Sequence, residues 1–522
     1  MSTVGAYFRL ARAGWVMVRE GVFAALPGDQ LVGLPKLGWR LSRVLARRRS
    51  TARDRSESLS KAAARLGPSY VKLGQFLATR PDVVGADVAL DLASLQDRME
   101  TFPQDQAVAT VEASLGRPVG ELYATFGAPV AAASIAQVHR ATSAETGAPV
   151  AVKVIRPGVR RRFFQDLESY FVAAGLQERF IPASRRLRPV EVTQTLAQTT
   201  KIEMDLRLEA AALSEIAENT KNDPGFRVPT VDWARTGRDV LTLEWIDGVK
   251  LSDIEGVRAA GHDLEALSVS LIQTFLRHTL RDGFFHADMH PGNLFVQDDG
   301  TIVAVDFGIT GRLGKKERRF LAEILYGFIT RDYRRVAEVH FEAGYVPANH
   351  DVAAFAQAIR AIGEPIHGQP AETISMARLL TLLFEVTELF DMTTRTELVM
   401  LQKTMVVVEG VSRSLNPAFN MWKAAEPVVR EWIASHLGPQ GVLSDARDGV
   451  AAVLSLARQA PELAARTEKL SREIDHMAEH GLRFDDATAK AIGKAEARAA
   501  RSGRIALWVI AATLVWIAWA LN

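Results

Sequence analysis

The sequence predicts a two-lobed α+β fold, with a helical extension before it and further helices after it. Residues 135–141 and 149–155 have the composition of two β-strands joined by a short loop, and residues 241–245 alternate in polarity as a third strand. From residue 247 to about 435 the pattern is mostly helical. A small β-rich lobe is therefore expected to precede a larger helical lobe.

Length and composition exclude several classes of protein. At 522 residues the chain is too long for one compact core, and it has no cysteine, which excludes disulfides, thiolate catalysis and cysteine-ligated metal sites. The hydrophobic share of 48% and the net charge of +2 are ordinary for a globular protein, so nothing demands nucleic acid as a partner. Because no secretory signal is recognisable, the bulk of the chain is expected in the cytosol.

The chain divides into six expected segments. They are a basic amphipathic segment (1–60), a helical extension (61–125), a small lobe (126–246), a large lobe (247–435), a charged helical region (436–500) and a transmembrane helix (505–521). The first segment resembles a surface helix on anionic lipid, and a helix packed on the rest of the protein explains it equally well. Residues 190–219 are expected to form one long helix that ends before Pro224.

The strongest chemical signal is the block from His286 to Asn293, which is followed after a hairpin by Asp306, Phe307 and Gly308. A kinase catalytic loop has the form His-x-Asp-x-x-x-x-Asn, in which the aspartate accepts the proton of the attacking group and the asparagine binds magnesium. Asp288 and Asn293 occupy these two positions. A turn with buried core histidines, or a two-histidine half of a zinc site, is the alternative.

A predicted hairpin brings the two expected magnesium ligands together. Residues 294–296 and 302–305 are apolar and flank an Asp-Asp-Gly turn, so they are expected to pair and to bring Asn293 close to Asp306. Two oxygen ligands suit Mg²⁺, which takes one or two carboxylates together with phosphate oxygens and water. ATP or ADP with Mg²⁺ is therefore the expected cofactor.

A second signal lies upstream, in the strands of the small lobe. Residues 131–138 fit the kinase nucleotide loop Gly-x-Gly-x-x-Gly-x-Val with alanine at each glycine position, and Lys153 follows on the next strand. An alanine run alone is as often a packing contact, but its place before Lys153 favours a cover for phosphate. Glu209 is the expected helix partner of Lys153. The expected nucleotide-binding residues are Ala131, Ala132, Ala133, Ser134, Ala136, Val138, Lys153 and Glu244.

With these motifs the sequence resembles the UbiB-type atypical kinases, which are associated with ubiquinone biosynthesis. The resemblance spans roughly residues 60–420. Its specific elements are Lys-x-Gly-Gln at Lys72–Gln75, the alanine loop at residues 131–134, and Glu-x-Asp at Glu203 and Asp205. The catalytic block has Met289 where the family usually has proline. This departure lies between functional positions.

The resemblance implies a protein-kinase-like fold whose N-terminal extension covers the site where a peptide substrate would lie. It also implies nucleotide binding with magnesium, ATPase activity coupled to lipid quinone precursors, and contact with other enzymes of ubiquinone assembly. A regulatory latch is expected in which Lys72 and Gln75 face Glu203 and Asp205. Glu203 and Asp205 are two positions apart, so an ideal helix would point them in nearly opposite directions.

The C-terminus resembles a membrane anchor. Residues 505–521 are uncharged and follow Arg498, Arg501 and Arg504, and a spanning helix needs about 20 apolar residues, with a usable range of about 17–25. Basic residues before the span predict that the chain lies on the cytosolic face of the cell inner membrane. The alternative is a buried or dimer-forming helix, so a homodimer stays open.

Two other functions compete with this interpretation. Small-molecule phosphotransferases of the aminoglycoside or choline kinase type also have a His-x-Asp-x-His-x-x-Asn block, but the alanine loop and the Lys-x-Gly-Gln helix argue against them. A non-catalytic lipid-binding scaffold that uses nucleotide only as a structural ligand is the second competitor. Magnesium-dependent ATP turnover separates that scaffold from an enzyme.

Overall fold

The computed structural model describes residues 3–22, 55–78, 84, 88, 91–92, 99–180, 185, 188–368, 386, 389–392 and 396–436. The chain forms two compact units, Met1–Ala434 and Ser435–Asn522. The described residues belong to the first unit, apart from Ser435 and His436. The expected charged region 436–500, after its first residue, and the expected transmembrane helix 505–521 lie outside the described residues.

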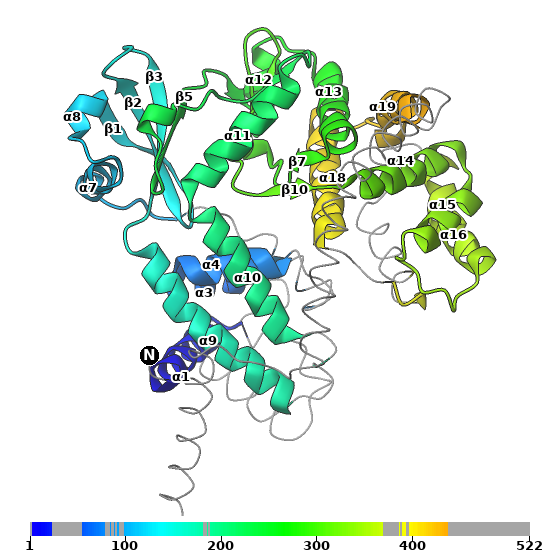
Figure 1. Cartoon of the computed structure of the whole chain (residues 1–522), viewed down its shortest axis with the longest axis horizontal. Helices are drawn as coiled ribbons and strands as arrows, with labels where there is room; N and C mark the ends of the chain where they lie inside the picture. Colours follow the sequence, from blue (N-terminus) through cyan, green and yellow to red (C-terminus); the bar gives the residue numbers. More distant parts are fainter. Residues whose placement is uncertain are drawn as a thin grey trace, which may run out of the picture. The chain divides into compact units, whose positions relative to one another are not determined.

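The small lobe is built on an antiparallel sheet with the strand order β1-β2-β3-β5 (Figure 1). Its strands are β1 (Tyr123–Ala132), β2 (Ala136–Ser143), β3 (Pro149–Ile155) and β5 (Val240–Glu244). The strands expected at 135–141, 149–155 and 241–245 are present. The sheet nevertheless begins earlier than the sequence suggested. The additional strand β1 was not predicted, because it has no regular alternation and its register against β2 shifts around Pro129.

The two faces of this sheet have different partners. Val150, Val152 and Val154 are buried in a cluster with Phe102 and with α7 (Gln104–Leu115). Alternate residues of a strand point to opposite faces, so Lys153 lies on the other face. On that side, α11 (Leu206–Thr220) contacts β5 (Figure 1). The outer face is thus filled by apolar side chains, and the inner face carries the chemically active lysine.

The long helix expected at 190–219 is wrong, because the chain forms two helices there. α10 spans Pro189–Glu203, and α11 begins at Leu206 after a break at Met204 and Asp205. Asp205 is the N-cap of α11, and its carboxylate accepts a hydrogen bond from the backbone N–H of Arg207. A capping aspartate satisfies one of the unpaired N–H groups at a helix start, which makes this break locally favourable.

The N-terminal extension is helical. The described helices before the sheet are α1 (Thr3–Arg19), α3 (Arg55–Leu66), α4 (Pro68–Ala78), α7 and α8 (Val119–Leu122), with the expected Gly67-Pro68 step between α3 and α4. α1 and α4 both contact α9 (Val159–Phe180), which follows β3 in sequence and also packs on α10. The extension is therefore attached to the small lobe through α9 (Figure 1).

The large lobe holds most of the remaining helices and two small sheets. One sheet has the order β4-β9-β8-β6 and the other pairs β10 with β7. The strands are β4 (Phe226–Arg227), β6 (Val249–Lys250), β7 (Phe284–His286), β8 (Leu294–Val296), β9 (Ile302–Ala304) and β10 (Thr310–Arg312). The helices are α12 (Ile254–Ala259), α13 (Leu264–Arg277), α14 (Lys315–Thr330), α15 (Tyr333–Glu342), α16 (Val352–Gly368), α18 (Thr396–Leu415) and α19 (Met421–His436).

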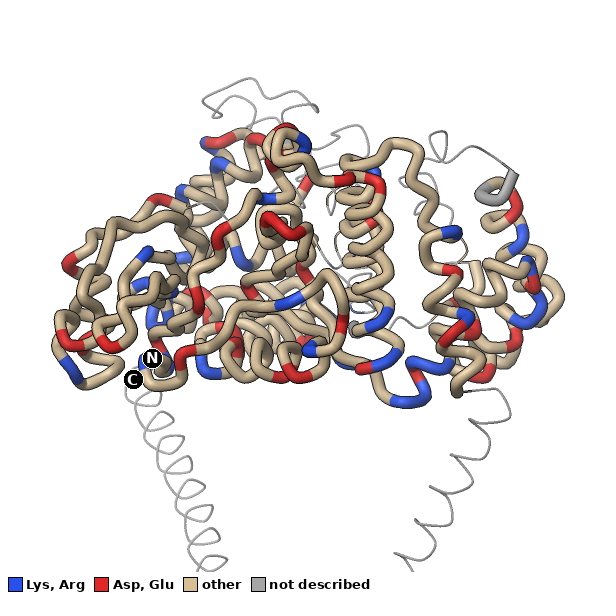
Figure 2. The backbone as a smooth tube through the Cα atoms, turned by 90° about the horizontal axis from the view of Figure 1, so that it is seen from above, with Lys and Arg blue, Asp and Glu red and all other residues tan. Residues whose placement is uncertain are grey.

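Charge and hydropathy of the described part agree with an ordinary folded protein. Figure 2 shows lysine and arginine interspersed with aspartate and glutamate along the backbone. Within the ranges that the structure describes, no helix combines the length and apolarity needed to cross a membrane.

Candidate active site

Lys153 binds two carboxylates, one from its own lobe and one from the large lobe. Its Nζ donates to Glu209 Oε1 at 2.8 Å and Oε2 at 3.0 Å, and to Asp306 Oδ1 at 2.9 Å. β3 presents the lysine, α11 presents the glutamate, and the loop after β9 presents the aspartate. The expected pairing of Lys153 with Glu209 is present in the structure, and Asp306 joins it from a position 153 residues away.

Burial and charge act against each other in this cluster. Burial alone would lower the pKa of Lys153, but the charges of Asp306 and Glu209 outweigh it and hold the pKa above its ordinary value. Burial raises the pKa of Glu209 despite the attraction of Lys153. The surrounding protein disfavours ionised Asp306, yet Lys153 lowers the pKa of that carboxyl to about 2. Lys153 and Asp306 therefore face the inter-lobe site as a cation and an anion.

The catalytic loop is fixed by the buried ring of His286. Its Nδ1 accepts the backbone N–H of Asp288 at 3.0 Å, so the ring is neutral and its Nε2–H donates to Val305 O at 3.3 Å. Burial lowers the pKa of His286, which agrees with this neutral form. The ring also packs on Phe307, with 4.5 Å between ring centroids. His286 is thus a structural link between the catalytic loop and the Asp-Phe-Gly segment.

Asp288 is half-buried, and its carboxylate has no recorded hydrogen-bond partner among the described residues. Its backbone oxygen, in contrast, accepts the N–H of His290 at 2.8 Å and the side-chain amide of Asn293 at 3.2 Å. The backbone is therefore held while the carboxylate stays open to accept a proton.

The predicted hairpin is present and brings Asn293 and Asp306 together. β8 and β9 are antiparallel, and the N–H of Val305 donates to Asn293 O at 2.9 Å. Asp306 has φ +63°, a left-handed conformation that costs energy outside glycine. Strain of this kind collects at functional sites, where the surrounding structure over-determines the backbone. Here the ion pair with Lys153 helps to hold it.

The alanine loop forms the turn of the β1–β2 hairpin. Ala131 and Ala132 end β1, Ala133 and Ser134 belong to the turn, and Ala136 and Val138 lie on β2. Val138 is directly opposite Lys153 in the β2–β3 register, so the two share a face of the sheet. The structure thus places the loop and the lysine on adjacent strands, as the sequence suggested.

Glu244 ends β5, next to β3, and its carboxylate is held away from the cluster. It forms an ion pair with Arg227, with 2.9 Å between Nη2 and Oε1, and accepts the N–H of Thr230 at 3.2 Å. The structure gives its side chain a role in joining β4 to β5. Its expected contact with nucleotide stays a prediction.

The expected latch is present in part. Lys72 and Glu203 form a buried ion pair between α4 and α10, with side chains 11% and 4% exposed. Asp205 does not join them, because its carboxylate binds the guanidinium of Arg207 at 2.7 Å and caps α11. The expectation that Glu203 and Asp205 hold the lysine together is therefore wrong. Gln75 is half-buried and has no recorded hydrogen bond in the described structure.

Three further residues near the site were not predicted from the sequence. Gln137 binds the backbone of Phe102, Arg156 binds the carbonyl of Ala133, and Thr404 Oγ1 donates to Ala287 O at 3.0 Å. Gln137 lies inside the loop motif between Ala136 and Val138, so a polar side chain between these two apolar positions was the available signal. Thr404 gave none, since its partner is 117 residues away.

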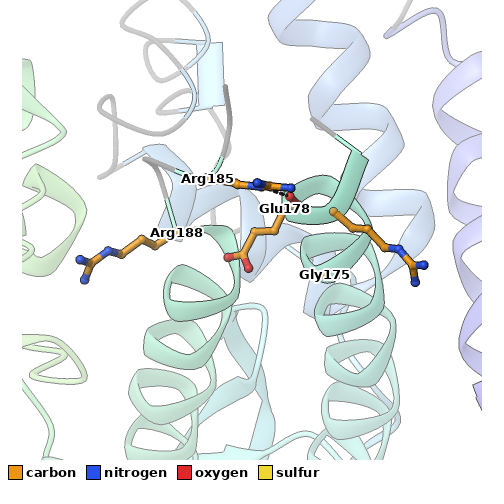
Figure 3. Close-up of a pocket in the computed structure, with 5 residues that line it drawn as sticks. Gly175, Glu178, Arg185 and Arg188 are labelled. Atoms are coloured by element: carbon orange, nitrogen blue, oxygen red, sulfur yellow. Dashed lines mark hydrogen bonds between the residues drawn. The ribbon is translucent and has the colours of Figure 1, made fainter. Parts of the chain in front are cut away.

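An open hollow of about 440 Å³ lies elsewhere, between the end of α9 and the start of α10. Its arginines point in different directions around Glu178 (Figure 3). Arg185 Nε donates to Glu178 O at 2.8 Å, and Glu178 Oε1 accepts the N–H of Val190 at 3.1 Å. The hollow is a helix junction, and the convergence of Lys153 with Asp306 marks the site better.

Comparisons with known proteins indicate the same kind of site, that of an atypical kinase. Residues 94–340 match the family profile of the ABC1 atypical kinase-like domain, and residues 359–420 match that of the UbiB helical domain. A relative from Marinobacter nauticus, named "Probable protein kinase UbiB", is 38% identical over 462 residues, which are 87% of this chain and 84% of that protein. The chain belongs to the UbiB family.

Other UbiB relatives align with this chain over a similar share of their length. Proteins with the same name from Azotobacter vinelandii and Pseudomonas aeruginosa are 38% and 37% identical to this chain, over 90% and 91% of its length and 87% and 89% of theirs. A solved structure from Mycobacterium tuberculosis, described as a complex with erythromycin, aligns with 73% of this chain and 98% of its own at 24% identity and a TM-score of 0.47. The family membership and the two lobes establish a kinase-like α+β fold.

Proposed function

We propose that this chain is a magnesium-dependent ATPase or phosphotransferase that supports ubiquinone biosynthesis at a membrane. The observation that carries the proposal is the double contact of Lys153 with Glu209 and Asp306, one hairpin away from the catalytic loop. Kinase sites need the lysine–glutamate pair and the Asp-Phe-Gly aspartate in place together.

Each residue has a role in the proposed chemistry. Lys153 pairs with the α- and β-phosphates, and Glu209 keeps its ammonium group directed into the cleft. Asp288 accepts the proton of the attacking hydroxyl or water, which its open carboxylate permits. The alanine loop covers the phosphates from the β1–β2 turn.

The residues present fit a bound Mg²⁺. Asn293 and Asp306 supply oxygen atoms from two segments that a backbone hydrogen bond joins, and the Asp306 side chain is 43% exposed. In the described ranges no group of three or more histidine, aspartate or glutamate side chains could hold a metal, which suits an ion completed by phosphate oxygens and water. When bound, Mg²⁺ would offset the negative charge of the phosphates.

The biological half of the proposal, a role in ubiquinone biosynthesis at a membrane, rests on the family to which the chain belongs. The relatives are named "Probable protein kinase UbiB", and ubiquinone precursors are isoprenoid lipids, so a membrane is the natural place of action. We assign the chain to the cytosolic face of the cell inner membrane, near other enzymes of ubiquinone assembly. The predicted anchor at 505–521 would hold it there.

The first described helix supports a membrane location. α1 carries arginines and no acidic residue, its Ala6 and Ala13 are buried, and Tyr7, Phe8 and Trp15 are 51%, 74% and 51% exposed. Exposed aromatic rings beside cationic side chains favour the surface of an anionic bilayer. α1 would then be a second point of contact with the membrane.

Two experiments test the function. Purified full-length protein should hydrolyse ATP only when Mg²⁺ is present, and turnover absent under both conditions would favour the non-catalytic scaffold. Quinone profiling of a deletion strain should show loss of ubiquinone and accumulation of an early prenylated precursor. An unchanged profile would remove the biological half and leave a small-molecule phosphotransferase as the better interpretation.

A further inference from the structure

We infer that Gln137 and Arg156 are positioning residues that tie the nucleotide loop to residues 99–102 of the N-terminal extension. This inference rests on the proposed function, because it assigns the control of nucleotide affinity at that same site. Three contacts make this connection, and each of them involves a backbone group of the loop or of residues 99–102. They lie on the side of the sheet opposite Lys153.

Gln137 uses its whole side-chain amide. Oε1 accepts the N–H of Phe102 at 2.9 Å, while Nε2 donates to Phe102 O at 3.2 Å and to His139 Nε2 at 2.9 Å. His139 must then carry its proton on Nδ1, from which it donates to Gly127 O at 2.9 Å. Gln137 and His139 are 1% and 0% exposed. A buried amide with every donor satisfied fixes the geometry of its partners.

Arg156 makes the second tie. One guanidinium nitrogen, Nη2, donates both to Glu100 O at 2.9 Å and to Ala133 O at 3.3 Å. The same guanidinium lies over the ring of Phe102, 5.3 Å from its centroid. A third tie is a backbone bond, in which the N–H of Met99 donates to Ala132 O at 3.3 Å. Two successive carbonyl groups of the loop are therefore bound by the extension and by Arg156.

The ties act on the orientation of the loop. In a trans peptide the C=O and the following N–H point in opposite directions, so holding the carbonyls of Ala132 and Ala133 also sets the N–H groups of Ala133 and Ser134. The N–H of Ala133 donates to Ala136 O at 2.8 Å within the turn, so the contacts on the two carbonyls act together with that bond on the shape of the loop. Kinase nucleotide loops cover the phosphates of ATP, which makes the position of the loop important for affinity. Phe102 belongs to the outer apolar cluster with Val152, whereas Lys153 faces the cleft. Gln137 therefore affects nucleotide binding through the position of the loop and not by direct contact.

The chain offers a matched control. Gln104 is another glutamine of the same region, and its Nε2 donates to Phe126 O at 2.8 Å. It also joins the extension to β1, but it does so away from the turn and at an exposed position. Gln104→Ala removes a comparable bond without releasing residues 131–138.

The experiment measures the affinity of purified full-length protein for a fluorescent ADP analogue with Mg²⁺. Gln137→Leu and Arg156→Lys should each raise Kd about five- to tenfold, the effect of losing one to two net hydrogen bonds, while Gln104→Ala should leave Kd within about twofold. Turnover at saturating ATP should change less than Kd. Hydrogen exchange of residues 131–138 should accelerate in the first two variants only.

The outcomes separate the two proposals. Wild-type protein that binds no nucleotide would overturn the proposed function, and this role with it. Wild-type binding with unchanged Kd in both folded variants would overturn the tie alone. A fall in melting temperature without a change in Kd would show that Gln137 is merely structural. Arg156→Lys keeps the charge of a half-exposed side chain, so it tests the tie even if Gln137→Leu does not fold.

Discussion

Lys72 and Lys153 each lie beside a buried glutamate. Glu203 and Glu209 are 4% and 5% exposed in their side chains, and the charge of Glu203 helps to raise the pKa of Glu209, so the two pairs share one electrostatic environment. Removing one partner of a buried pair is costly because the other charge is left without compensation.

A double-mutant cycle tests the first pair. Lys72→Met should lower the free energy of unfolding by about 3 kcal/mol, and adding Glu203→Leu should restore much of it, with a coupling energy of about 1–3 kcal/mol. Lys72→Met with Asp205→Asn should be additive within about 0.5 kcal/mol, since Asp205 binds Arg207. Chemical denaturation provides the energies. Additivity between Lys72 and Glu203 would contradict the pair.

The residues found from sequence differ physically from those that were missed. Asp288, Asn293 and Asp306 lie close together along the chain, and their chemistry requires fixed spacing. Thr404 acts through a partner 117 residues away, so nothing local in the sequence marks it. The polar side chain of Gln137 within the loop motif was a signal, but it did not indicate that its partner is Phe102, 35 residues away. Asp205 was misassigned because a capping role depends on where the helix starts.

At the scale of elements, the strands and the hairpin followed from local pattern. β2, β3, β5 and the β8–β9 hairpin were predictable because each alternates or carries a turn signal. β1 was not, since its register shifts break the alternation. The gap between α10 and α11 was also missed, because helix-forming residues continue through it and Asp205 was not identified as an N-cap.

The packing of α15 gives a pH-dependent prediction. His340 Nδ1 donates to Val336 O at 2.7 Å, its ring packs on Phe355, and burial lowers its pKa below the ordinary value. The folded state therefore favours the neutral ring. Its contribution to stability is complete above about pH 6.5 and is lost as the pH falls from there toward the folded pKa.

His340→Phe should remove this dependence, because phenylalanine does not titrate. Between pH 7.5 and 5.5 the melting temperature of the variant should fall less than that of the wild type. In the wild type, one histidine can change the free energy of unfolding by up to about 1.4 kcal/mol per pH unit. Calorimetry at a series of pH values gives the comparison. Parallel curves would show that His340 does not titrate on unfolding.

For the whole molecule, the order of motifs along the chain predicted two lobes with the cleft between them. The residue pairs that close that cleft required the structure, because Lys153 and Asp306 come from opposite lobes. The six expected segment boundaries stay predictions, as does the anchor at 505–521.

Membrane attachment is tested with two changes. A chain that ends at Arg504 should be released by alkaline carbonate, whereas the full-length protein should stay with the membrane pellet. Phe8→Ser with Trp15→Ser should weaken any binding that remains in the shortened chain. Full-length protein that is soluble without detergent would contradict the anchor.

The central claim is that Lys153, Asp288 and Asp306 form one catalytic centre, and steady-state ATP turnover tests it most directly. Lys153→Ala, Asp288→Asn and Asp306→Asn should each lower turnover at saturating nucleotide by at least about 100-fold, since they remove phosphate pairing, the proton acceptor and a magnesium ligand. Asparagine tolerates the positive φ of position 306, so that variant should fold. Asp299→Asn, in the turn of the same hairpin, should keep normal turnover. Near-normal rates in all three folded variants would contradict the claim.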